Sequence, residues 1–203
     1  MKRAEKTELT VSKILEAALD EFGANGYAGG TINNICKRGI NKGLIYHNFK
    51  DKDALYLACL ERSCKKLVTL IEESGCTSDQ LQYMQLRMKF FRDYPNEAHI
   101  FFEAILQPQQ KLHDRIQQIL QPFEDINERI YRSVVSGITL RDGITPEDAI
   151  GYFRQMQRMF NGYYSSSAYR HIALNEQIRE HEMNLSKLLD FMLYGIAKGG
   201  TEK

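Results

Sequence analysis

Apolar residues recur at helical spacing along almost the whole chain, and this periodicity constrains the fold more than any other feature. In the first stretch Ile14, Ala18 and Phe22 lie at i, i+4 and i+8, so they share one face of a helix. No run of alternating β-branched residues, which would indicate a strand, occurs anywhere in the sequence. The sequence therefore predicts an all-α fold.

Glycine, proline and capping residues divide this pattern into segments. The first helix is expected to end near 23–26. Two short helices, 32–38 and 42–48, are expected to follow the capping residues Thr31 and Asn41. A long helix is expected from Asp51 to about residue 74, and further helices at 79–94, 98–106, 109–136, 146–171 and 175–197. Pro122 lies inside one of these and has no N–H to donate, so it should kink or break that helix.

Composition excludes several classes of protein. The chain has 203 residues, of which 43% are hydrophobic and 26% charged, so it can bury a core without disulfides. The spacing of its four cysteines fits no common metal template, and we expect neither a metal site nor a cofactor. No stretch approaches the ~20 apolar residues of a membrane span. The charged N-terminus leads to no signal-peptide core, so the sequence predicts a cytoplasmic protein.

The net charge of +1 conceals a local basic region. Residues 27–52 contain five Lys or Arg and one Asp, whereas the rest of the chain is net negative. A basic stretch on two short helices is typical of a surface that binds phosphates. Any nucleic-acid interface is therefore expected in this segment.

Residues 31–52 read as two short helices joined by a tight turn at Gly39. In such a unit the second helix enters the major groove of DNA and the first crosses the backbone. Ile45 and Phe49 should pack inward, and Thr31 can offer a hydroxyl and free N–H groups to a phosphate. The outward side of the second helix then carries Lys42, Gly43, Leu44, Tyr46, His47 and Lys50.

Two runs of sequence in this region resemble the TetR/AcrR family of transcriptional regulators. They are residues 14–27, with ILEAALDEF followed by NGY, and residues 42–55, KGLIYHNFKDKDAL. The chain departs from the family in two places. Its turn is one residue shorter, because Arg38 is followed directly by Gly39, Ile40 and Asn41. Asn48 stands where the family usually has Tyr or His.

The resemblance implies a helix-turn-helix DNA-binding domain over residues 1–52 and a helical ligand-binding and dimerisation domain over 53–203. It also implies a homodimer that binds a palindromic double-stranded DNA operator, most often as a repressor, and is released by a small molecule. Ligand binding would change the spacing of the two DNA-binding domains, which must match successive major grooves ~34 Å apart. The family places DNA contacts at Thr31, Lys42, Gly43, Leu44, Tyr46, His47 and Lys50.

The resemblance also suggests roles for apolar residues of the second domain. Side chains that could line a ligand pocket are Met84, Met88, Phe91, Phe102, Phe123, Met159 and Tyr163. Those on the last two helices that could form a dimer interface are Phe153, Met156, Phe160, Leu185, Leu188, Leu189, Met192 and Ile196.

Each assignment has an alternative. The pocket and interface residues could be ordinary core, Leu44 could pack inward, and the basic stretch could be a solvated surface. An enzyme would need a thiolate pair of Cys36 with His47, although Cys36 is expected to be buried and inert. An interaction module that has lost DNA binding would explain the shortened turn. No other catalytic arrangement stands out in the sequence, so we expect a protein that is not an enzyme.

Overall fold

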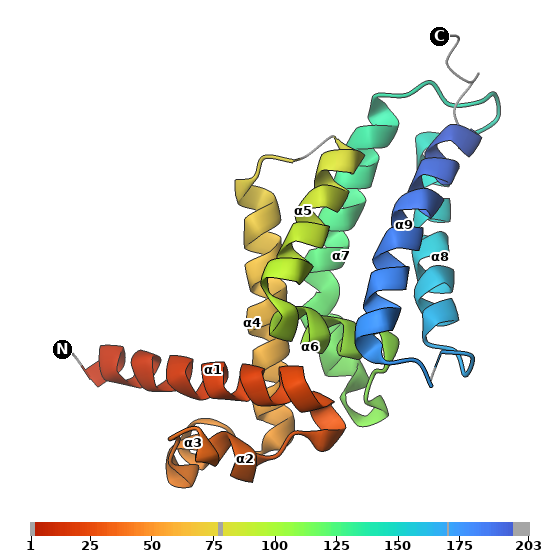
Figure 1. The fold of residues 1–203 in the computed structure, drawn as a ribbon. Coiled ribbons are helices and arrows are strands. Elements are labelled where there is room, and N and C mark those ends of the chain that lie inside the picture. The colour runs from red at the N-terminus through yellow and green to blue at the C-terminus, as the bar shows by residue number, and fades with distance from the viewer. Residues whose placement is uncertain (1–2, 77–78, 170, 197–203) are drawn as a thin grey trace. The chain divides into compact units, whose positions relative to one another are not determined.

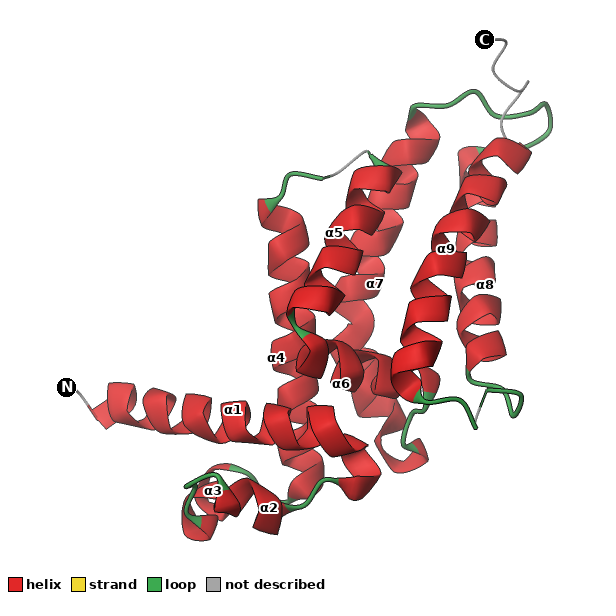
Figure 2. Cartoon of the chain, viewed as in Figure 1, coloured by secondary structure: helices red, strands yellow, loops and turns green. Residues whose placement is uncertain are grey.

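The computed structural model describes residues 3–76, 79–169 and 171–196, and the regular elements among them are helices (Figure 2). This confirms the predicted all-α fold class. None of the described helices is long and apolar enough to cross a bilayer. In chain order the elements are α1 (Arg3–Gly29), α2 (Ile32–Lys37), α3 (Lys42–Asn48), α4 (Lys52–Glu73), α5 (Gln80–Asp93), α6 (Pro95–Leu106), the 3₁₀ turn η1 (Gln110–Leu112), α7 (His113–Ser136), α8 (Pro146–Tyr164) and α9 (Leu174–Ile196).

The start and stop signals read from the sequence explain most helix ends. Thr31 and Asn41 cap α2 and α3, because their side chains accept hydrogen bonds from the N–H groups of Asn34 and Gly43. Asp51 caps α4 in the same way, at 2.8 Å from the Ala54 nitrogen. The first helix leaves helical geometry at Gly26, whose φ of 66° suits a residue without a Cβ.

Three helix boundaries differ from the expectation. α6 begins at Pro95, since proline is well suited to the first turn of a helix, where its missing N–H has no intrahelical partner. α7 continues through Pro122, which therefore does not end it. α8 ends at Tyr164, several residues earlier than expected.

Contacts divide the chain into two compact units that differ from the predicted boundary after residue 52. The N-terminal unit consists of residues 1–66 together with 91–120, and the C-terminal unit of 67–90 together with 121–203. In the N-terminal unit α1 packs against α6 (Figure 1). The side chains of Phe22, Tyr56 and Phe102 are almost fully buried there. The helix-turn-helix thus shares its core with α6, a segment more than 40 residues further along the chain.

The C-terminal unit is built from α8 and α9, which lie side by side (Figure 1), and from parts of α4, α5 and α7. Tyr131 of α7 stacks on Phe153 of α8, with ring centroids 4.0 Å apart. Leu185 and Leu189 of α9 are buried as well. The apolar periodicity of these helices therefore serves packing within the unit.

Candidate functional site

The helix-turn-helix is held together by a small apolar core and two capped helix starts. Ile32 and Ile35 of α2 and Ile45 of α3 are buried, and Phe49 is half-buried just after α3. Gly39 makes the turn with a φ of 86°, which an L-residue with a side chain rarely adopts. With Ile45 facing inward, the opposite side of α3 faces solvent.

That outward side carries every α3 residue that the sequence singled out. Lys42, Gly43 and His47 are exposed, while Leu44 and Tyr46 are 46% and 50% exposed. Half-exposure of Leu44 disfavours its assignment to the core and leaves its side chain available to a ligand. Lys50, two residues after α3, is also exposed.

Gly43 has a local structural role besides any contact with DNA. A Cβ built at this position would lie 3.1 Å from Oδ1 of Asn41, the atom that accepts the Gly43 N–H at 2.7 Å. A larger residue would therefore crowd the cap of α3.

A buried carboxylate on α1, which the sequence analysis missed, supports the start of α2. Oε1 of Glu21 accepts the Thr31 N–H at 3.2 Å and a hydrogen bond from Nδ2 of Asn34 at 2.9 Å. The Asn34 N–H is donated to Oγ1 of Thr31 at 3.1 Å. The N–H groups of Thr31 and Asn34 are thus already used within the chain, and the Thr31 hydroxyl can still donate its proton to a phosphate. The only sequence signal was an acidic residue within the apolar run that ends at Phe22.

The basic side chains around the turn are oriented by neutral amides and one acid. Nζ of Lys42 lies 3.1 Å from Oδ1 of Asn33, and Nζ of Lys37 lies 3.1 Å from Oδ1 of Asn34. Arg38 instead pairs with Asp20 at 3.0 Å. In these contacts Lys42 and Lys37 face a neutral amide oxygen, whereas the charge of Arg38 is partly offset by Asp20.

The structure does not support the thiolate pair that an enzyme would need. Cys36 is half-exposed on α2 rather than buried as expected, because the buried face of this helix is formed by Ile32 and Ile35. Among the described residues, no hydrogen bond joins Cys36 to His47. The nearby Cys59 is buried, and burial raises the pKa of its thiol to about 12.

The residues expected to line a ligand pocket have very different surroundings. Met84 and Phe123 are buried in the C-terminal unit, while Phe91 and Phe102 pack together in the N-terminal unit, with ring centroids 4.7 Å apart. The other three are exposed on helix surfaces, namely Met88 at 48%, Met159 at 67% and Tyr163 at 59%. These seven side chains thus differ in exposure and in the unit to which they belong, and their place in a ligand pocket stays a prediction.

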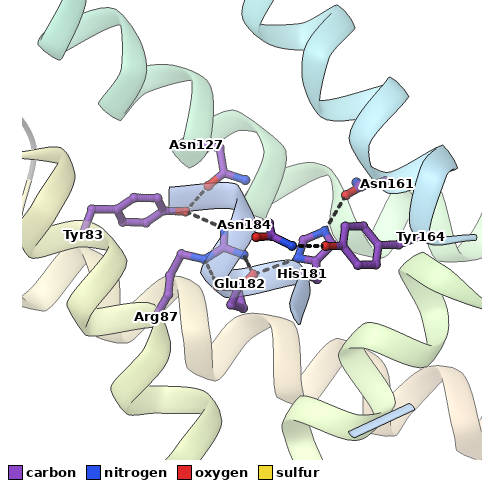
Figure 3. A network of polar contacts seen from close by, with 8 residues as sticks. All are labelled: Tyr83, Arg87, Asn127, Asn161, Tyr164, His181, Glu182 and Asn184. Carbon is purple, nitrogen blue, oxygen red and sulfur yellow. Dashed lines mark hydrogen bonds and ion pairs between the residues drawn. The ribbon is translucent and has the colours of Figure 1, made fainter. Parts of the chain in front are cut away.

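The C-terminal unit instead contains a buried polar network that the sequence did not reveal (Figure 3). The Arg87 guanidinium donates two hydrogen bonds to the carboxylate of Glu182, at 2.7 and 3.0 Å, and a third to the hydroxyl of Tyr83 at 3.2 Å. The imidazole of His181 lies between Glu182, at 3.1 Å, and Oδ1 of Asn161, at 2.9 Å. The Tyr83 hydroxyl also contacts Asn127, and Asn184 donates to the hydroxyl of Tyr164.

This network joins α5, α7, α8 and α9 through groups that are costly to bury alone. Burial by itself would raise the pKa of Glu182, but the charge of Arg87, followed by a hydrogen bond from His181, lowers it below the usual value. Glu182 is thus held as a carboxylate inside the unit.

The residues predicted to form a dimer interface on α8 and α9 fall into a buried group and a partly exposed group. Phe153, Leu185 and Leu189 are buried within their own chain, so they are not available to a partner, while Met156, Phe160, Leu188 and Met192 are partly exposed. The side chain of Ile196 lies outside the described residues. A neighbouring stripe is much more exposed, and it consists of Tyr152, Met159 and Tyr163 on α8 and Met183, Phe191 and Tyr194 on α9. We refer to these six side chains as the exposed aromatic stripe.

The comparison with known proteins agrees with the geometry of the N-terminal unit. The model of the tetR family of bacterial regulatory proteins matches residues 14–59, which run from α1 through the helix-turn-helix into α4. This part of the chain is therefore similar to the tetR family of bacterial regulatory proteins. The resemblance read from residues 14–27 and 42–55 is thereby confirmed.

Curated TetR-type relatives match part of the chain. The HTH-type transcriptional regulator RutR of Escherichia coli (strain K12) is 28% identical over 120 residues, which cover 57% of each protein. The HTH-type transcriptional repressor AcnR of Corynebacterium diphtheriae is 33% identical over 72 residues, covering 34% of this chain and 38% of AcnR. The chain thus spans little more than half the length of RutR.

Solved structures extend the likeness to the whole fold. The transcriptional regulator FadR from Bacillus subtilis, solved in complex with stearoyl-CoA, has a TM-score of 0.65 and 18% identity, covering 91% of this chain and 98% of FadR. HlyIIR, a hemolysin II transcriptional regulator, has a TM-score of 0.59 and 17% identity. At these identities the likeness concerns the fold alone.

Proposed function

We propose that this protein is a ligand-responsive transcriptional repressor of the TetR family that binds a palindromic operator as a homodimer and is released by a small molecule. The observation that carries the proposal is the solvent-facing side of α3. It presents Lys42, Leu44, Tyr46 and His47 on a helix whose start is capped and whose inner side is anchored by Ile45. Its shape fits the major groove, and its polar groups suit phosphates and base edges.

The proposed contacts have distinct chemical roles. Lys42 and Lys50 would neutralise phosphates, and the hydroxyl of Tyr46 and the ring of His47 would donate hydrogen bonds. Leu44 would meet a thymine methyl group. Thr31 would contact a phosphate through its hydroxyl, since its N–H is donated to Glu21.

The exposed aromatic stripe supports a homodimer. Each of the two neighbouring helices exposes three large apolar side chains, which water solvates poorly. A second copy of the chain would present the same surface, as a twofold interface requires. We assign the interface to this stripe together with Met156, Phe160, Leu188 and Met192.

The small molecule would act by favouring one of two dimer states. It must bind the DNA-competent and the released state with different affinity, or the equilibrium does not shift. The stearoyl-CoA complex of FadR supports the idea that a protein of this fold binds a small molecule. We place the site of this chain in the C-terminal unit and leave the chemical class of its ligand open.

DNA binding is tested by fluorescence anisotropy with genomic fragments selected by the purified protein and a scrambled duplex as the control. We expect tight binding to the selected DNA alone, weakening with salt at a log–log slope of about −0.9 per phosphate neutralised. Lys42→Ala should weaken binding and reduce the steepness of this slope by about one unit. Tyr46→Ala should also weaken binding.

The matched control is Lys65→Ala, which removes an exposed lysine of α4 outside the helix-turn-helix. Its affinity should stay within about twofold of the wild type, since surface substitutions away from a site have small effects. Equal affinity of the Lys42 and Tyr46 variants and the wild type would show that α3 is not the reading helix.

A further inference from the structure

Glu103 is a buried carboxylate in the apolar helix α6, and its partners lie on two other helices. It is 6% exposed. Its two oxygens accept the backbone N–H of Tyr27 at 2.8 and 3.0 Å, and Oε2 accepts the hydroxyl of Tyr56 at 2.9 Å. One side chain of α6 thus joins the end of α1 to the second turn of α4.

The local backbone of α1 is shaped to receive this carboxylate. At Gly26 the chain leaves helical geometry, with φ 66° and ψ 178°, so that the following N–H of Tyr27 is directed to Glu103. A Cβ built on Gly26 would lie 2.8 Å from Oε1 of Glu103. Only glycine both adopts this φ readily and leaves room for the carboxylate.

Tyr27 makes a second contact through its side chain. The hydroxyl of Tyr27 donates to Oδ1 of Asp53 at 2.5 Å, and Nζ of Lys111 lies 2.6 and 2.9 Å from the two Asp53 oxygens. Lys111 belongs to η1, which follows α6. The hydrogen bond from Lys111, followed by that from Tyr27, lowers the pKa of Asp53, so Asp53 is charged in this pair.

Tyr27 and Asp53 bracket the helix-turn-helix in the sequence. Tyr27 stands four residues before the cap of α2, and Asp53 stands in the first turn of α4, five residues after the end of α3. The segment of α6 and η1 therefore holds both ends of the helix-turn-helix through Glu103 and Lys111. Both contacts lie within the N-terminal unit, and neither side chain belongs to the outward face of α3.

We propose that Glu103, supported by the Asp53–Lys111 pair, is a positioning residue that fixes the orientation of the helix-turn-helix on α6. This inference rests on the proposed DNA-binding function. It makes the DNA-binding unit discontinuous in sequence, with α6 and η1 as part of it. A displacement of α6 would then be passed on to α3 without any change in the residues that face DNA.

The test compares Glu103→Ala, Glu103→Gln and Lys111→Ala in the full-length chain, at a temperature where circular dichroism shows all of them folded. Hydrogen exchange of the amides of residues 27–48 reports on the contact without any need for DNA. We expect Glu103→Ala to speed exchange of the Tyr27 amide about tenfold or more, because this N–H loses its acceptor. Glu103→Gln keeps a carbonyl oxygen for the same N–H and should restore much of the protection.

Operator affinity gives the second readout. Glu103→Ala should weaken binding about tenfold, while the salt dependence of binding stays that of the wild type because no phosphate contact is lost. Lys42→Ala, by contrast, should change that salt dependence. Glu97→Ala is the matched control, since it removes a carboxylate of the same helix that pairs with Lys66 at 2.8 Å, outside the helix-turn-helix. It should leave both readouts within about twofold of the wild type.

Wild-type exchange and wild-type affinity in Glu103→Ala would overturn the proposal. So would a weaker salt dependence in that variant, because Glu103 would then act on the DNA contacts themselves. If Glu103→Ala does not fold, Lys111→Ala decides the same question, because loss of its contact with Asp53 should also speed amide exchange around Tyr27 and weaken operator binding. Wild-type behaviour of Lys111→Ala in both readouts would then overturn the proposal. If the wild type binds no DNA, the proposed function fails, and hydrogen exchange still shows whether Glu103 holds the end of α1.

Discussion

At the scale of single residues, the buried pair of Arg87 and Glu182 shows how polar groups can be accommodated in a small helical unit. Both side chains are about 95% buried and share two hydrogen bonds. Removing two charges from water is expensive, and the mutual attraction offsets this cost only while both partners are present. The pair therefore makes the packing of α5 on α9 specific more than it adds net stability.

This argument predicts a strong asymmetry between single and double substitutions. Glu182→Ala should lower the free energy of unfolding by about 3–5 kcal/mol, because it leaves a buried guanidinium without its carboxylate. Arg87→Met combined with Glu182→Leu should recover most of that loss. Urea unfolding of the wild type and these two variants measures both effects. The exposed pair of Arg179 and Glu176 is the control, and Glu176→Ala should change stability by less than about 0.5 kcal/mol.

The same pair predicts how stability depends on pH. The pKa of Glu182 in the folded state lies below about 4.5, the pKa of a glutamate in the unfolded chain. Its contribution to the free energy of unfolding is therefore fully present above about pH 4.5 and is lost as the pH falls through the folded pKa. Among the described residues, Arg87, His181 and Tyr83 are charged or titratable groups that act on it. The unfolding free energy of the wild type should therefore fall more steeply below pH 4.5 than that of the double variant. Parallel curves in urea titrations at pH 7, 5, 4 and 3 would contradict this role.

These residues also show which contacts could be predicted from the sequence and which could not. The residues facing outward on α3 were predicted because the cap, the turn and the buried Ile45 are all local features, read within 20 residues. Glu103 contacts Tyr27 across 76 residues, and Arg87 contacts Glu182 across 95. No spacing rule joins such distant positions. An acid between Phe102 and Ala104 was the one visible sign that α6 holds a buried carboxylate.

At the scale of elements, helix starts are the most predictable feature of this chain. Thr145, a preferred capping residue, stands directly before α8 in the sequence, and the structure contains the full reciprocal arrangement. Its Oγ1 accepts the Asp148 N–H at 3.1 Å, while the Asp148 carboxylate accepts the Thr145 N–H at 2.9 Å. The signal is local, so the sequence was sufficient to find it.

We expect Thr145→Ala to lower the free energy of unfolding by about 1 kcal/mol, since it removes the acceptor for an N–H at the start of α8. Chemical denaturation provides the measurement. Thr139→Ala, at an exposed loop position, is the matched control and should be within about 0.5 kcal/mol of the wild type. If both threonines gave equal losses, the cap would contribute nothing of its own.

Apolar stripes were harder to interpret than caps. On α8 the sequence predicted an interface of Phe153, Met156 and Phe160, whereas the most exposed apolar side chains are Tyr152, Met159 and Tyr163. Tyr152 and Met159 each stand one position before a residue of the predicted set. Periodicity finds an apolar stripe but does not show what covers it. A helix that packs on its own chain and also binds a partner carries two such stripes, and only the three-dimensional packing distinguishes them.

At the scale of the whole molecule, the exposed aromatic stripe leads to a testable prediction about dimer formation. Phe191 is 73% exposed on α9, and we place it at the twofold interface. Phe191→Glu would put two like charges near each other in an apolar contact, so we expect a monomer by light scattering with an unchanged helical content. Because each monomer would bind one half-site alone, its affinity for a palindromic operator should fall by about 100-fold. Leu81→Glu is the matched control, since Leu81 is 65% exposed on α5 and lies outside the stripe. If the Phe191→Glu variant stayed dimeric, the dimer interface would lie elsewhere on the chain. If it were monomeric and kept full operator affinity, one copy of the chain would be sufficient for recognition.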